Sequence, residues 1–198
     1  MDNYEYLIAG LPVLSQDWTA HSSLSADSVI EEIRNGCSKK DNALIDTLLS
    51  GYMEENFNEA FYSSMLAHRN RFIKEFFTFD LRARNAKVRY LNDRLGRDAD
   101  RDIFLGVEPD LEEDARLDAV FSEDDLLKRE KGLDSLIWDK VSDITLFDYF
   151  NINVILGFIA KLKIIDRWLK LDESTGREMF RKLVDEIRGT FKGVEFND

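Results

Sequence analysis

The sequence predicts an all-α fold in which two packed helical lobes form a multi-helix bundle. Proline, which interrupts helices, occurs only twice in 198 residues, as Pro12 and Pro109. Leucine, alanine, glutamate, arginine and lysine, which favour helices, are abundant, and apolar residues recur at the spacing of a helix face along most of the chain. With 44% hydrophobic and 33% charged residues, the composition is typical of a globular protein with its own core.

Residues 1–14 are the exception to the helical pattern. Tyr4, Tyr6 and Ile8 alternate with other residues and Pro12 follows, which is typical of a short strand or an extended arm that ends in a turn. The first residues are acidic rather than basic, so this stretch lacks the positive region of a secretory signal. The fold expectation therefore includes a short extended segment at the N-terminus.

Two helices are expected next. Ser25 or Asp27 can cap a helix that ends near Gly36, and a second helix runs from Asp41 to Gly51. Both carry isoleucine and leucine at helical spacing, which predicts that one face of each helix packs on the core.

The stretch from residue 58 to residue 95 contains neither proline nor glycine, which favours one long helix or two helices joined by a kink. At about 100° per residue, several of its basic residues fall inside roughly 80° of the helix circumference. These residues, named here the basic stripe, are Arg71, Lys74, Arg82 and Arg89. Arg84 and Lys87 fall in the apolar arc, which indicates either a break in the helix or aliphatic stems that reach past apolar neighbours to an acidic group.

Residues 97–130, named here the acidic segment, hold thirteen acidic and five basic side chains. Residues 97–121 are interpreted as an acidic connection between an N-terminal lobe, 1–96, and a C-terminal lobe, 122–198, with at least 97–114 forming a loop. Ser122 and Asp125 resemble a capping box that restarts the helix. The basic stripe is expected to pair with this segment or with an acidic partner. The candidate partner-binding residues are therefore the stripe together with Glu112, Glu113 and Asp114.

The C-terminal third reads as helices throughout. The uncharged run Ile152–Ala160 is much shorter than the roughly 20 apolar residues that span a bilayer, so we expect it to be the buried centre of the lobe. Asp148 or Asn151 can cap its helix. We also expect Phe147, Tyr149 and Phe150 to support this core. A last amphipathic helix over 172–191 is expected to pack back through Phe180, Leu183, Val184, Ile187 and Phe191.

Motifs for chemistry are scarce. The sequence has neither of the glycine-rich phosphate-binding patterns, and His21 and His68 have no partner at a metal-ligand spacing. Cys37 follows a glycine at a helix end, where the helix dipole would raise the pKa of a thiol, and we interpret it as a plain free cysteine. These features predict a protein that is not an enzyme and needs no cofactor, although an enzyme that uses carboxylates without a motif stays an alternative.

The formal charge of −12 disfavours nucleic acid and anionic lipid as partners, so we expect neither nucleic-acid binding nor direct lipid insertion. RNA binding by the basic stripe alone is disfavoured by the acidic segment that follows and by the lack of a nucleic-acid-binding module. The single cysteine agrees with a reducing compartment, and the cytoplasm is the expected location.

Three stretches together resemble a known family: NYEYLIAGLPVLS at 3–15, DLRARNAKVRYLNDRLGRD at 80–98, and the segment 138–187, which starts WDKVSDITLFDYF. They look like a bacterial family whose genes accompany those of V-type ATPases and which is related to the V-type C subunit, named d in eukaryotes. The resemblance implies an all-helical protein that seats the central rotor stalk on the membrane proteolipid ring and performs no chemistry. The C subunit is funnel-like, and its full-length archaeal form is considerably longer than this chain, which argues against a complete funnel here.

The resemblance therefore implies a structural component of a V-type ATPase or ATP synthase, with the central stalk and proteolipid ring as partners. Such a protein would be cytoplasmic and held at the inner membrane through those partners. The alternative is a free-standing helical adaptor or regulatory protein that acts through protein–protein interaction. The sequence does not indicate the oligomeric state of the isolated protein.

Overall fold

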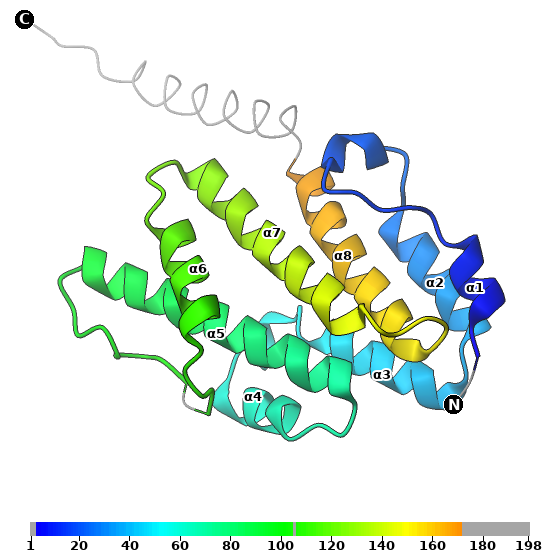
Figure 1. Ribbon diagram of the computed structural model, residues 1–198, viewed down its shortest axis with the longest axis horizontal. Helices are drawn as coiled ribbons and strands as arrows, with labels where there is room; N and C mark the ends of the chain where they lie inside the picture. The colour runs from blue at the N-terminus through cyan, green and yellow to red at the C-terminus, as the bar shows by residue number, and fades with distance from the viewer. Residues whose placement is uncertain (1–2, 105, 172–198) are drawn as a thin grey trace, which may run out of the picture.

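The computed structural model describes residues 3–104 and 106–171, and within these ranges it is entirely helical (Figure 1). The described residues form eight α-helices and two short 3-10 helices, and they contain no strand. The all-α class and the helical bundle are thereby confirmed. The helix predicted over 172–191 lies outside the described residues.

The helices follow one another with short connections. The α-helices are α1 (Glu5–Gly10), α2 (Ala26–Gly36), α3 (Lys39–Ser50), α4 (Glu59–Leu66), α5 (Arg71–Arg94), α6 (Leu111–Phe121), α7 (Leu126–Thr145) and α8 (Ile152–Lys170). The 3-10 helices are η1 (Trp18–His21) and η2 (Glu54–Asn56). Figure 1 shows α7 and α8 side by side, with α5 crossing beneath them and α2 beside α8.

The short strand or extended arm expected within residues 1–14 is wrong for residues 5–10, because these form α1 after Tyr4 at its N-cap. Tyr4 is buried, and Leu7, Ile8 and Leu11 pack against the main core, at the spacing of a helix face. The Tyr4 hydroxyl donates to Asp41 Oδ2 at 2.5 Å. These contacts with the main core stabilise a helix here, although the weak alternation in the sequence favours a strand.

Most helix starts follow local capping chemistry. Ser25 caps α2 through a bond from the Ser28 backbone N–H, and Asn151, rather than Asp148, caps α8. Asp125 caps α7, but Ser122 closes α6 instead of joining a capping box, so that part of the prediction is wrong.

The long stretch 58–95 is two helices, α4 and α5, separated at residues 67–70. Asn70 ends the gap, because its side chain accepts the Ile73 N–H and donates to Asn153 Oδ1 on α8 at 3.0 Å. The acidic connection contains a further helix, α6, which begins where Asp110 accepts the N–H groups of Glu112 and Glu113. The loop expected through residue 114 therefore stops at residue 110.

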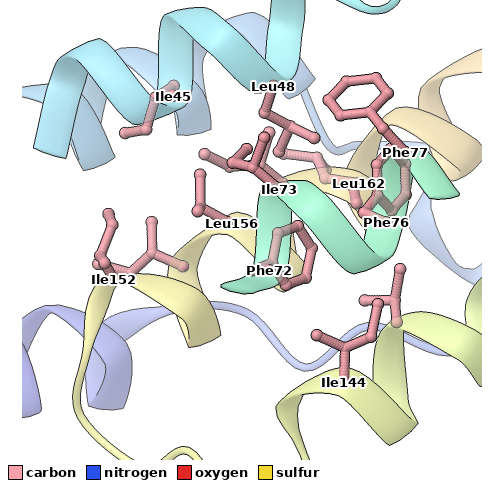
Figure 2. Close-up of a cluster of buried hydrophobic side chains, with 14 of the residues drawn as sticks. Ile45, Leu48, Phe72, Ile73, Phe76, Phe77, Ile144, Ile152, Leu156 and Leu162 are labelled. Carbon is pink, nitrogen blue, oxygen red and sulfur yellow. The ribbon is translucent and has the colours of Figure 1, made fainter. Parts of the chain in front are cut away.

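The main core contains side chains from both predicted lobes, as Figure 2 shows. Its fully buried large members include Ile45, Leu48, Phe72, Ile73, Phe77, Ile155, Leu156, Ile159 and Leu162. The uncharged run Ile152–Ala160 lies at this centre, as predicted. No helix among the described residues is long and apolar enough to cross a membrane.

A candidate protein-interaction site

The connection between α7 and α8 presents large apolar side chains to solvent. Residues 146–150, named here the apolar loop, expose Leu146, Phe147, Tyr149 and Phe150. Phe147 is 82% exposed, so the expectation that this group supports the core is wrong. Isolated exposed apolar residues are ordinary, but four on one short loop form a patch typical of an interaction site.

Hydrogen bonds and an ion pair hold the apolar loop in place. Asp148 is the anchor: its Oδ2 lies 2.5 Å from Arg71 Nη2, and its Oδ1 accepts a hydrogen bond from Asn151 Nδ2 at 2.6 Å. Arg71 also donates to the Ile144 carbonyl at 2.9 Å, and the Tyr4 N–H donates to the Phe150 carbonyl at 2.8 Å. The backbone is thus fixed at both ends while the apolar side chains face outward.

The basic stripe does not act as one surface. Arg71 holds the apolar loop, whereas Arg82 is only 9% exposed and lies 2.9 Å from both Glu113 and Asp114. Arg82 Nη2 also donates to the Glu108 carbonyl at 2.7 Å. Its Nε faces Glu113 at an angle that makes an ion pair but no hydrogen bond.

The remaining candidate residues are solvent-exposed. Arg89 pairs with Asp100 at 3.1 Å, and both side chains are more than half exposed. Lys74 and Glu112 are exposed, and neither side chain makes an ion pair with a described residue. The structure therefore brings Arg82, Glu113 and Asp114 together and leaves Lys74 and Glu112 apart from them.

Arg84 and Lys87, which fell in the apolar arc, reach different groups from an unbroken α5. The Arg84 guanidinium lies 3.7 Å from the centre of the Phe104 ring, and Lys87 Nζ lies 3.5 Å from Glu130. Lys87 therefore fits the second alternative, in which an aliphatic stem reaches past apolar neighbours to an acidic group. Arg84 instead makes a cation–π contact with Phe104.

Buried carboxylates elsewhere join helices to one another. Asp134 on α7 accepts hydrogen bonds from Arg167 and from Trp168 Nε1 on α8, and its burial raises its pKa against the effect of these donors. Asp80 accepts from the Tyr62 hydroxyl at 2.6 Å, and burial likewise raises the pKa of Asp80. Within residues 3–104 and 106–171, no group of three or more histidine, cysteine, aspartate or glutamate side chains could hold a metal ion.

Cys37 lies half-buried after α2. Burial, and then the nearby Asp41 carboxylate, raise the pKa of its thiol to about 11. The pKa of the thiol is raised, in the expected direction, but burial rather than the helix dipole is the principal cause.

Alkylation of Cys37 should reflect this pKa. At pH 8 the fraction of thiolate is about a hundredfold lower than for a thiol with the ordinary value. Iodoacetamide should therefore react about a hundredfold more slowly with the native protein than with the same protein unfolded in urea, measured by intact mass over time. Equal alkylation rates in the native and the unfolded protein would contradict a raised pKa of the Cys37 thiol.

Comparison with known proteins gives one family match. Residues 108–190 match the model of a family described as "Protein of unknown function (DUF2764)", and this range covers about two-fifths of the chain. No curated protein and no solved structure matches the chain. The matched family is uncharacterised, and nothing in the match links it to the C subunit of V-type ATPases. The resemblance to that protein is therefore wrong, and the coupling role that depended on it loses its basis.

Proposed function

We propose that this protein is a helical adaptor that binds another protein through the apolar loop and performs no chemistry of its own. The observation that carries the proposal is the outward presentation of Leu146, Phe147, Tyr149 and Phe150 on a loop anchored by Arg71 and Asp148. A protein without a partner gains nothing from exposing two phenylalanines and a tyrosine together, since burying each ring would stabilise it by about 2 kcal/mol.

The loop has the properties of a binding hot spot. Aromatic side chains dominate the energy of protein interfaces, and they are most effective where the backbone needs no ordering on binding. Here the backbone is already fixed by Asp148, Asn151 and the Tyr4 N–H. Tyr6, two residues after Tyr4, is 93% exposed and adds a further aromatic side chain beside this end of the bundle.

The partner best suited to this surface is a protein with an apolar cleft. The net charge of −12 repels phosphate groups, and the arginine beside the loop, Arg71, is already paired with Asp148. Binding to a lipid surface would need a surplus of cations near the aromatic residues, which this surface lacks among the described residues. Lipid binding is therefore disfavoured, and observing it would contradict the proposal. The cytoplasm is retained as the proposed location.

A site-specific photo-crosslinker tests the proposal in the full chain. A photoreactive phenylalanine at position 147 should form a covalent adduct with one protein in cells of the source organism. The same group at Leu127, an exposed position at the other end of α7, serves as the matched control. The captured protein, once purified, should bind the wild type, and Phe147→Ala with Tyr149→Ala should weaken that binding at least about a hundredfold.

Adducts of equal yield and identity at both positions would overturn the proposal. Sedimentation with vesicles of phosphatidylcholine and phosphatidylserine supplies the other decisive comparison. Binding to vesicles that Phe147→Ala abolishes, without a protein adduct at position 147, would show a lipid-binding loop instead.

Arg71→Ala should weaken partner binding about tenfold although Arg71 lies behind the loop, because the released loop must be ordered again on binding. The free energy of unfolding should fall by less than about 1 kcal/mol, since Arg71 is about half exposed. Lys74→Ala, one turn along α5 and without an ion pair among the described residues, is the control and should change neither quantity. Calorimetric titration and urea unfolding measure the two effects, and unchanged affinity in Arg71→Ala would show that the anchor is dispensable.

A further inference from the structure

A second surface lies between α2, α3 and α8, and it shares no lining residue with the apolar loop. It is a groove of about 380 Å³, a size within the range of clefts that seat ligands, about 300–1,000 Å³. Tyr52 is 41% exposed and Met53 49% exposed, so large apolar side chains are accessible in it. The groove is lined by Asp27, Ile30, Glu31, Arg34, Leu49, Tyr52, Met53 and Lys163.

The cations beside the groove are already paired. Arg34 Nη2 lies 2.6 Å from Asp46 Oδ1. Lys163 and Lys170 both pair with Asp166 Oδ2, at 3.3 Å and 2.8 Å. Since each of these positive charges has a carboxylate partner, they contribute little attraction for an anionic ligand.

The acidic groups of the groove are in surplus. Asp27 and Glu31, one turn apart on α2, are exposed, and neither makes an ion pair with a described residue. Glu54 and Glu55, which come directly after the last groove residue of the α3 wall, are exposed as well. The stretch 41–68, which contains this wall, has five acidic residues and neither lysine nor arginine. The groove therefore combines an apolar floor with an acidic rim, which favours a cationic ligand over phosphate groups or anionic lipid.

The shape of the groove suits a helix as its ligand. A helix laid along α2 would present residues of its own at i, i+3 or i+4, and i+7 to this face. Binding of an extended peptide by strand addition needs a sheet edge, and the described residues contain no strand. Four lining residues recur at the spacing of one face of α2 and cover about 10 Å of its length: Asp27, Ile30, Glu31 and Arg34.

We propose that this groove binds an amphipathic helix of a partner protein. The apolar face of that helix lies on Ile30, Leu49 and Met53, and lysine or arginine residues beside this face pair with Asp27 and Glu31. The inference does not rest on the apolar loop. An adaptor that joins two proteins needs two separate binding surfaces, and the groove supplies the second.

Photo-crosslinking in the full chain identifies the ligand of the groove. A photoreactive phenylalanine replaces Met53 in cells of the source organism, and mass spectrometry identifies the crosslinked segment of the captured protein. This segment should carry apolar residues at the spacing of one helix face, with lysine or arginine next to them. The same group at Leu111, an 89% exposed position on α6, is the control and should not give this adduct.

Association and dissociation rates then separate the two parts of the interaction, with a synthetic peptide of the captured segment as the probe. Glu31→Lys should slow association at least about tenfold, because charges at the rim act mainly on the association rate. Glu32→Lys is the matched control, since it makes the same charge change on the same helix at an exposed residue that does not line the groove. Met53→Ala should instead speed dissociation about tenfold.

Several results would overturn the proposal. They are an adduct with a second copy of this chain, a captured segment that is acidic or lacks an apolar helix face, and no adduct at position 53. Equal slowing by Glu31→Lys and Glu32→Lys would also overturn it, because the peptide would then respond only to the net charge. Phe147→Ala with Tyr149→Ala should leave both rates unchanged, so a failure of the groove can be told apart from a failure of the apolar loop.

Discussion

Replacing Phe72 by alanine is expected to lower the free energy of unfolding by about 4 kcal/mol. The Phe72 ring is fully buried and stacks on Phe76, with centroids 5.7 Å apart and planes 10° apart. It also approaches Gly157 on α8, where an added Cβ would lie 3.5 Å from Phe72 Cε2. The cavity would therefore open where α5 meets α8, and the backbone on both sides is too constrained to fill it.

Urea unfolding measured by circular dichroism checks this prediction. Phe147→Ala is the matched control, because it removes the same ring from an 82% exposed position and should change stability by less than about 0.5 kcal/mol. Similar losses for the two variants would mean that the ring at position 72 is not in the core, or that the apolar loop is covered within the chain.

Arg82→Ala is expected to destabilise the protein by about 3 kcal/mol, the second-largest effect of a single substitution. The guanidinium is 9% exposed and pairs with both Glu113 and Asp114, so its loss leaves two carboxylates of α6 without their cation. It also leaves the Glu108 carbonyl without its donor. Lys140, which lies 2.5 Å from Glu113, compensates only part of this loss.

Arg89→Ala, in the same helix and the same basic stripe, provides the comparison. Its ion pair with Asp100 is more than half exposed on both sides, so its removal should cost less than about 0.5 kcal/mol. Urea unfolding in low and in about 1 M salt separates the cases further, since screening weakens the exposed pair and leaves the buried one nearly unchanged. Equal losses of unfolding free energy in Arg82→Ala and Arg89→Ala would contradict the prediction that the buried ion pairs of Arg82 matter more than the exposed pair of Arg89.

This difference between Arg82 and Arg89 also shows how far the sequence could predict the candidate site. Helical spacing correctly places both residues in one helix, and composition indicates that the acidic segment is a suitable partner for them. The spacing does not reveal that α6 forms inside that segment and packs across α5 through Leu117 and Phe121. Because burial of Arg82 depends on this packing, the sequence alone ranks the four stripe residues as equals.

The apolar loop was missed for a related reason. A stretch such as LFDYF has the composition of a core segment, and only its position between two helices, beside Asp148 and Asn151, signals a loop. Large apolar residues at such a junction are a usable warning of exposure. Whether they are covered depends on which elements lie near the end of α7, and this is a property of the whole bundle.

The helical class, the burial of Ile152–Ala160 and several helix starts could be predicted from the amino-acid sequence alone. These features depend on neighbours within a few residues, since capping groups and apolar spacing act along one helix. Three features depend instead on how the helices pack: residues 5–10 form a helix, Arg82 is buried and Phe147 is exposed. Each of these depends on contacts between residues far apart in the chain, and local preferences of a few tenths of a kcal/mol are overruled where such contacts contribute several.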